Sequence, residues 1–324
     1  MADRVLELAV AGDDAAFAEL VAPLRGELHA HCYRMLGSVH DADDALQDAL
    51  VRAWRGLAGF SGRGSLRSWL YAVTTHSCLD AARSRRRRAL PMDLGPSSTT
   101  VVDSPPRTDV AWLGPHPDER YERREAVELA FVAALQHLPP NQRAALLMFE
   151  VLGFTADEIA DALATSTASV TSAIQRARAT AGSRTSRTSG ASDGRDPATP
   201  TPGERAVAAA FADALERGDA ATLVARLAAD VTWAMPPMPA WYAGREAVTA
   251  FARAVPLSGT CGTWRTVQTT ANALPAVACY LDSGNGHFAA WSVNAIAVQN
   301  DRIAAITTFQ DPAYFPLFGL PLSL

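Results

Sequence analysis

Apolar residues in the first part of the chain recur every three or four positions, a spacing that predicts amphipathic helices. One stripe consists of Phe17, Leu20, Val21, Leu24 and Leu28. We therefore expect one helix from residue 13 to Gly37, a second from Asp41 to Leu57, and a third that is capped by Ser65. Residues 13–88 are predicted to be nearly all helix.

The pattern of residues 155–178 fits a helix-turn-helix. Thr155 and Glu158 form a capping box that starts the first helix. A short turn at 164–166 leads to a second helix with its own apolar stripe. In such a unit the second helix enters the major groove of DNA, although an ordinary helical hairpin in a core shares the pattern. The polar residues that this helix presents to bases or phosphates are Ser169, Thr171, Ser172, Gln175, Arg176 and Arg178.

Two segments lack helical periodicity and read as linkers. Residues 91–117 contain repeated prolines among Ser, Thr, Asp and Gly, and residues 183–203 are of low complexity. After the second linker the pattern changes to one or two helices over 204–228, followed by short segments rich in β-branched and aromatic residues. This last part is expected to be an α+β domain with a curved sheet.

Charge and cysteine content narrow the classes of function. The net charge of −5 is unusual for a DNA-binding protein, but arginines cluster at 83–88 and 176–187 while aspartates cluster at 41–48. The four cysteines form no CxxC pair, so we expect neither a disulfide framework nor a metal site. No apolar run approaches the roughly 20 residues of a membrane helix, and no signal-peptide pattern is present. A cytoplasmic, nucleoid-associated protein is expected.

Three motifs in order carry a family resemblance. The first motif is Asp43-Asp44-Ala45-Leu46-Gln47-Asp48, which is followed by Arg52-Ala53-Trp54. The second is Arg67-Ser68-Trp69-Leu70-Tyr71, which is followed by Cys78-Leu79-Asp80. The third is the helix-turn-helix within residues 138–178. Together they resemble the extracytoplasmic-function (ECF) sigma factors of the sigma-70 family. The resemblance implies RNA polymerase core as a partner, through the clamp helices of the large subunit and the flap region, and promoter DNA as a second partner.

The resemblance also implies site residues. The core polymerase-binding set is Asp43, Asp44, Gln47, Asp48 and Arg52. The set for melted DNA of the minus-ten element is Arg63, Arg67, Trp69, Tyr71, His76, Asp80 and Arg83. Many family members carry Asn at the position of His76, and His cannot pair with adenine in the same bidentate way, so the family's preferred melted sequence is not carried over to this chain. Trp69 is equally compatible with a place in the core.

Residues 204–324 resemble a SnoaL-like domain of the nuclear transport factor 2 superfamily, a cone of helices on a curved sheet. Such appendages regulate some sigma factors in cis. A small apolar ligand is a further possibility, with a candidate pocket formed by Trp233, Met235, Trp241, Trp264 and Trp291. No acid–base pair emerges among Asp230, Asp282, His287, Asp301 and Asp311, so we expect no catalytic residues and no cofactor.

The sequence thus predicts two all-helical sigma domains followed by an α+β domain. The expected boundaries are 1–90 for sigma domain 2, 91–117 for a linker, 118–182 for sigma domain 4, 183–203 for a second linker, and 204–324 for the SnoaL-like domain. Two alternatives remain: a DNA-binding activator that never replaces a resident sigma subunit, and a bifunctional sigma factor whose last domain is an enzyme or binds a ligand.

Overall fold

The computed structural model describes residues 2–60, 62, 64–84, 86–117, 129–188, 199–282, 284 and 286–324. The chain divides into two compact units, one made of Met1–Arg87 and Ala130–Ser189 and the other of Arg88–Leu129 and Gly190–Leu324. Among the described residues, no helix combines the length and the apolar character needed to cross a membrane.

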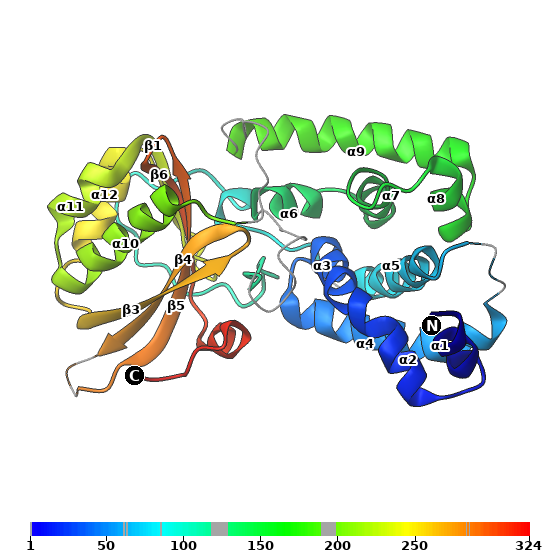
Figure 1. Cartoon of the computed structure of the whole chain (residues 1–324). Helices are drawn as coiled ribbons and strands as arrows, with labels where there is room; N and C mark the ends of the chain where they lie inside the picture. The colour runs from blue at the N-terminus through cyan, green and yellow to red at the C-terminus, as the bar shows by residue number, and fades with distance from the viewer. Residues whose placement is uncertain are drawn as a thin grey trace. The chain divides into compact units, whose positions relative to one another are not determined.

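The first unit is all helical (Figure 1). Its N-terminal half contains α1 (Ala2–Val10), α2 (Asp14–Val21), α3 (Arg25–Leu36), α4 (Val39–Gly56) and α5 (Leu66–Ser84). Helices α3, α4 and α5 pack against one another and bury Leu28, Tyr33 and Leu70. Its second half contains α6 (Leu129–Gln136), α7 (Pro140–Glu150), α8 (Ala156–Ala162) and α9 (Thr167–Thr188), with α7 and α8 both packed on α9.

The expected single helix from residue 13 to Gly37 is interrupted. A 3-10 turn at Ala22–Leu24 separates α2 from α3 and contains Pro23. Proline lacks the amide hydrogen that an α-helix needs and clashes with the carbonyl four residues earlier, so the helix restarts after it. Gly37 does end α3, as predicted, in the left-handed conformation (φ 70°) that glycine adopts without strain.

The second unit is built on a six-stranded mixed sheet. Its strands are β1 (Leu227–Ala234), β2 (Trp241–Ala243), β3 (Thr263–Ala271), β4 (Leu274–Asp282), β5 (Ala289–Gln299) and β6 (Arg302–Phe309). The order is β2-β1-β6-β5-β4-β3, and only β1 and β6 run parallel. Register shifts in the β1–β6, β4–β5 and β5–β6 pairs interrupt the ladder, and such bulges bend strands.

Three helices cover one face of this sheet: α10 (Pro202–Arg217), α11 (Ala220–Arg226) and α12 (Arg245–Ala254) (Figure 1). Between them and the sheet lies a core that includes Phe211, Trp233 and Phe251. A 3-10 segment, η5 (Pro312–Phe318), packs on β5. The prediction of two helical domains followed by an α+β domain is therefore confirmed. Strand β2 and helix α12 were not expected from the sequence.

Residues 88–117, which join the two helical halves, belong to the second unit. We call this segment the linker. It contains a single short 3-10 turn, η3 (Pro91–Asp93), and is otherwise extended along the α+β domain. Its extended course agrees with its proline content. The second predicted linker begins later than expected, because α9 continues to Thr188; residues 189–198 lie outside the described part of the chain.

Candidate nucleic-acid and polymerase interfaces

The helix-turn-helix has the local geometry that its sequence predicts. The Thr155 amide donates to Glu158 Oε2 (2.8 Å) and the Glu158 amide donates to Thr155 Oγ1 (3.3 Å), which completes the capping box of α8. Ala164 adopts a positive φ (50°) in the turn. Ser166 then accepts from the Ser169 amide (3.2 Å) at the start of α9. Both helix starts and the turn between them are thus fixed by short-range bonds.

Helix α9 has one buried face and one exposed face. Val170, Ala173, Ile174 and Ala177 are buried against α7 and α8. The side chains predicted for duplex DNA lie on the other face, where all are exposed except Ser172, which is half-buried. Arg178 is engaged by an ion pair with Glu150 and lies over the ring of Phe149, whereas Arg176 is exposed near the middle of the helix. The exposed face matches what a recognition helix needs.

Helix α4 presents the residues predicted for polymerase. Asp44, Gln47, Asp48 and Arg52 are exposed along one face, beside the exposed apolar side chain of Val51. Asp43 differs from them, because its carboxylate lies 3.1 Å from Nε2 of the buried His29. The Asp43 side chain is still 44% exposed, so it lies at the margin of this face while its carboxylate contacts the buried histidine.

Asp80 on α5 connects two of the predicted sets. Its carboxylate accepts from Arg52 Nη1 at 2.7 Å and from Arg83 Nη1 at 3.1 Å. The hydrogen bond from Arg52 lowers the pKa of Asp80, and the positive charge of Arg83 adds to this effect. The carboxylate is therefore ionised at neutral pH and orients one arginine assigned to polymerase and one assigned to melted DNA.

Three residues of the melted-DNA set lie partly or wholly inside the helical unit. Tyr71 is fully buried, and its hydroxyl donates to Glu27 Oε2 (3.1 Å). Arg67 forms an ion pair with the same carboxylate (2.8 Å) and lies over the Tyr71 ring. Trp69 is half-buried against Phe60, with ring centroids 5.5 Å apart. Sequence reasoning missed Glu27, whose only signal was an acidic residue on a mostly apolar helix.

His76, Asp80 and Arg83 are the members of this set that lie exposed on α5. The His76 ring is held to its own helix, with Nδ1 2.9 Å from the carbonyl oxygen of Ala72. Arg63 lies outside the described residues. The exposed face of α5 therefore presents fewer of these side chains than the full set predicted from sequence.

The segment His29-Ala30-His31-Cys32 is buried in α3. His31 Nε2 lies 2.9 Å from Thr75 Oγ1, and burial lowers the pKa of His31 to about 3. Cys32 contacts Cys78, and burial raises the pKa of its thiol well above the ordinary value. These side chains thus have partners within the protein that suit the interior of a helical domain.

The aromatic residues proposed as a ligand pocket occupy different places in the α+β domain. Trp233 is buried between Phe211 and Phe251, and its Nε1 donates to Thr308 Oγ1 (2.8 Å). Met235 and Trp264 pack at the margin of that core. Trp291 is 44% exposed on β5. The structure therefore spreads these residues over the domain.

Trp241, the last member of that set, holds the linker. Its indole Nε1 donates to the Gly95 carbonyl (3.0 Å), and its own carbonyl accepts from the Ser98 amide (2.7 Å). Further along, the Arg107 amide donates to the Pro237 carbonyl (2.9 Å).

A second attachment lies at the end of the linker, where His116 and Asn272 are joined twice. The His116 amide donates to Asn272 Oδ1 (3.0 Å), and the Asn272 amide donates to the His116 carbonyl (2.9 Å). Asn272 has a positive φ (54°) in the β3–β4 turn, a conformation that asparagine tolerates better than most residues. Nothing in the sequence connected this turn with a segment about 150 residues earlier.

Known proteins resemble this chain over nearly its whole length. The chain matches the family models for Sigma-70 region 2 over residues 20–88 and for Sigma-70, region 4 over residues 128–180. It is 41% identical over 323 residues to the ECF RNA polymerase sigma factor SigG of Mycobacterium tuberculosis, which covers 97% of this chain and 85% of SigG. The ECF sigma factor SigE of Mycolicibacterium smegmatis is 33% identical over 174 residues, 52% of this chain and 62% of SigE.

A solved structure extends the likeness in fold to nearly the whole chain. The crystal structure of the extracytoplasmic function sigma factor SigJ of Mycobacterium tuberculosis superposes with a TM-score of 0.59 at 21% identity. The match covers 93% of this chain and 98% of SigJ.

Proposed function

The chain belongs to the ECF sigma factors of the sigma-70 family, which direct RNA polymerase in transcription initiation, and from this premise we propose which of its surfaces perform each step. Sigma factors bind polymerase core and promoter DNA. We assign core binding to the exposed face of α4, melted DNA to the exposed face of α5 that carries His76 and Arg83, and duplex DNA to α9. The place of action is then the cytoplasm, at the nucleoid.

The observation that carries this assignment is the two-sided character of α9. Its apolar face is fixed by α7 and α8, while its opposite face offers hydroxyl, amide and guanidinium groups to solvent. Hydroxyls and amides serve either bases or phosphates, and an exposed arginine suits guanine or the backbone. These donors lie together on the second helix of a helix-turn-helix, the position from which such a unit contacts DNA.

Run-off transcription tests the assignment. Purified chain is added to polymerase core that lacks any sigma subunit, with a template library of random upstream sequences. We expect transcripts that start at defined positions. An activator that never replaces a sigma subunit gives no transcript in this assay, and that result would remove the proposed roles of α4 and α5 together.

For the α+β domain we propose regulation in cis through the linker. Bonds from Trp241, Pro237 and Asn272 hold the linker at separate points. Leu113 of the linker is buried as well. The linker is the only covalent path between the two helical halves, so a domain that holds it limits the separations that these halves can reach. This argument supports regulation rather than chemistry as the role of the domain.

A further inference from the structure

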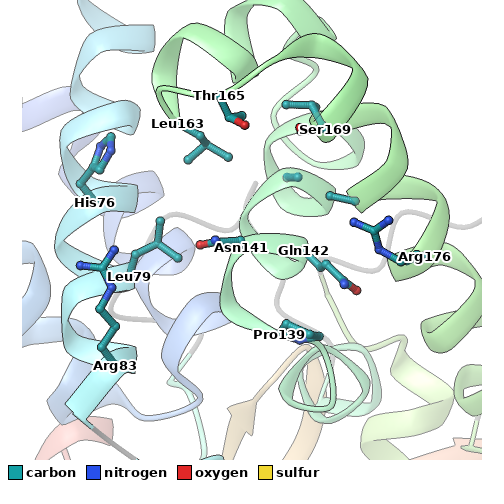
Figure 2. A pocket seen from close by; sticks show the side chains of 13 residues that line it. His76, Leu79, Arg83, Pro139, Asn141, Gln142, Leu163, Thr165, Ser169 and Arg176 are labelled. Carbon is teal, nitrogen blue, oxygen red and sulfur yellow. The ribbon is translucent and has the colours of Figure 1, made fainter.

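A groove in the helical unit brings together cationic, amide and apolar side chains from α5, α7 and the helix-turn-helix (Figure 2). Its volume is about 430 Å³. Sites for small organic molecules commonly have volumes of about 300–1,000 Å³. All of the lining residues belong to the same compact unit of the chain. The groove therefore has the size and the mixture of side chains that a small organic ligand requires.

The charged side chains of the groove favour an anionic ligand. Figure 2 shows Arg83 and His76 on α5 at one wall and Arg176 on α9 at the other. Among the described residues that line the groove, none is acidic. Asp80 accepts a hydrogen bond from Arg83 (3.1 Å) but is not among these lining residues. Guanidinium groups bind the oxygens of phosphate groups in a bidentate manner, so phosphates are the anions that suit this pair best.

The first turn of α7 adds to this preference. Pro139, Asn141 and Gln142 line the groove, and Pro139 is the N-cap residue of the helix, with a side chain that cannot accept a hydrogen bond. The first amides of a helix lie at the positive end of its dipole, where an anion is stabilised. The side-chain amides of Asn141 and Gln142 also offer a donor and an acceptor each. The end of α7 thus supplements the charge of the two arginines and supplies polar groups with directional hydrogen bonds.

The rest of the groove is apolar. Leu79, Leu163, Val170, Ala145 and Ala173 contribute to its lining. Leu79 and Val170 are buried, and Leu163 is half-buried. Apolar side chains pack against the face of a nucleobase, while Asn and Gln side chains form hydrogen bonds with its polar edge. The lining therefore contains a group of suitable chemistry for each part of a nucleotide.

We propose that this groove binds a nucleoside di- or triphosphate. The base packs against the apolar side chains with its edge toward Asn141 and Gln142, and the phosphates bind Arg83 and Arg176. Both arginines also belong to the sets assigned to DNA, so a bound nucleotide competes with promoter DNA for them. This competition rests on the proposed function, whereas the nucleotide site itself does not.

Binding of fluorescent nucleotides to the full-length chain tests the proposal without DNA or polymerase. The probes are the N-methylanthraniloyl derivatives of ATP, GTP, CTP and UTP, and fluorescence anisotropy follows their binding. We expect at least one probe to bind saturably and to be displaced by its unlabelled nucleotide, but far less by inorganic tripolyphosphate. Absence of saturable binding by all four probes would overturn the proposal. Equal displacement by tripolyphosphate would overturn it as well, because the base would then contribute nothing.

The variant Gln142→Glu locates the binding site. It keeps the length of the side chain but places a carboxylate in the groove, where it repels phosphates, so we expect nucleotide affinity to fall about tenfold or more. The fold should be retained, because a glutamate in the first turn of a helix is stabilised by the helix dipole. Gln268→Glu, the same change at an exposed position of β3, is the matched control and should bind as the parent does. Equal affinities of the parent and Gln142→Glu would exclude this groove.

A competition experiment connects the site with promoter binding. The DNA is a promoter duplex recovered from a random pool by the chain with polymerase core. We expect the nucleotide, at a saturating concentration, to weaken binding of this duplex several-fold in the parent but not in Gln142→Glu. Unchanged binding in the parent would overturn the competition. If the parent directs no transcription with core, the proposed function fails, and the anisotropy measurements still decide whether the groove binds a nucleotide.

Discussion

A buried histidine in α3 makes the stability of the helical unit depend on pH. The pKa of His31 is lowered from 6.5 to about 3 by burial, with a smaller contribution from the charge of Arg34. Between these values the unfolded chain binds a proton that the folded chain excludes. The free energy of unfolding contributed by this site is therefore intact above pH 6.5 and falls by about 1.4 kcal/mol per pH unit as the pH decreases toward 3.

Replacement of His31 should remove this dependence. In His31→Gln, the loss of unfolding free energy between pH 6.5 and 5 should be smaller than in the parent by about 1–2 kcal/mol. Urea denaturation followed by circular dichroism at several pH values measures it. Parallel curves for parent and His31→Gln would refute the assignment to His31.

Arg176 is the residue on α9 for which we expect the largest effect on duplex binding. If it contacts a base in a bidentate manner, Arg176→Ala should weaken binding to the promoter duplex by about 1–3 kcal/mol and relax specificity at one position. Fluorescence anisotropy with matched and single-mismatch duplexes measures both effects. Arg253→Ala, an exposed arginine on α12, serves as the control and should bind as the parent does. An unaltered footprint in Arg176→Ala would exclude it from the recognition set.

At the scale of elements, the periodicity of apolar residues predicted most helices of the first unit because their buried stripes are local patterns. The helix-turn-helix was placed within a few residues for the same reason. Periodicity did not predict elements and contacts that form only through residues distant in the sequence. Strand β2 is three residues long and exists through pairing with β1 and Ser98, and α12 follows it within two residues. The partners of Tyr71 and Asp43 likewise come from α3, which no spacing within their own helices indicates.

The exposed face of α4 can be tested as an element. Asp44→Ala combined with Gln47→Ala removes a charge and an amide from this face, and we expect polymerase core to bind roughly tenfold more weakly, or about 1.4 kcal/mol. Binding of the promoter duplex by the chain alone should not change. Asp213→Ala on α10 is the control for a lost exposed aspartate. Core affinity that equals the parent's would assign the interface to another element.

At the scale of the whole molecule, attachment of the linker to the α+β domain is the feature that the sequence concealed. Composition predicted an extended linker but not its binding partner, because its backbone hydrogen bonds carry no signature in side-chain type. Trp241 appeared to be a candidate for a ligand pocket, and the structure shows its indole bonded to Gly95. The role that we propose for the domain therefore depends on contacts between segments about 150 residues apart.

Weakening this attachment should be measurable without any knowledge of the promoter. Trp241→Phe removes the hydrogen bond to Gly95, worth about 1 kcal/mol, so transient detachment of the linker should increase about fivefold. The Ser98 amide donates to Trp241 and the Val102 amide to the Tyr242 hydroxyl (3.3 Å), so hydrogen exchange at these two amides reports that increase. Trp291→Phe replaces an exposed tryptophan of the same domain and should leave exchange in the linker unchanged.

Removal of residues 204–324 takes away the whole domain to which the linker is attached. We expect this deletion to alter run-off transcription. If output stayed the same at every promoter, the domain would play no part in initiation.

The pairing of Ser98 with Tyr242 has a consequence for solubility. Ser98 lies along β2, which is an outer strand of the sheet, so the linker shields backbone groups that another chain could otherwise pair with. When the linker detaches, the unpaired backbone N–H and C=O groups of β2 become accessible to another chain. We expect chains with a detached linker to self-associate through β2 when no polymerase is bound. Detachment after the chain has bound RNA polymerase would avoid this self-association.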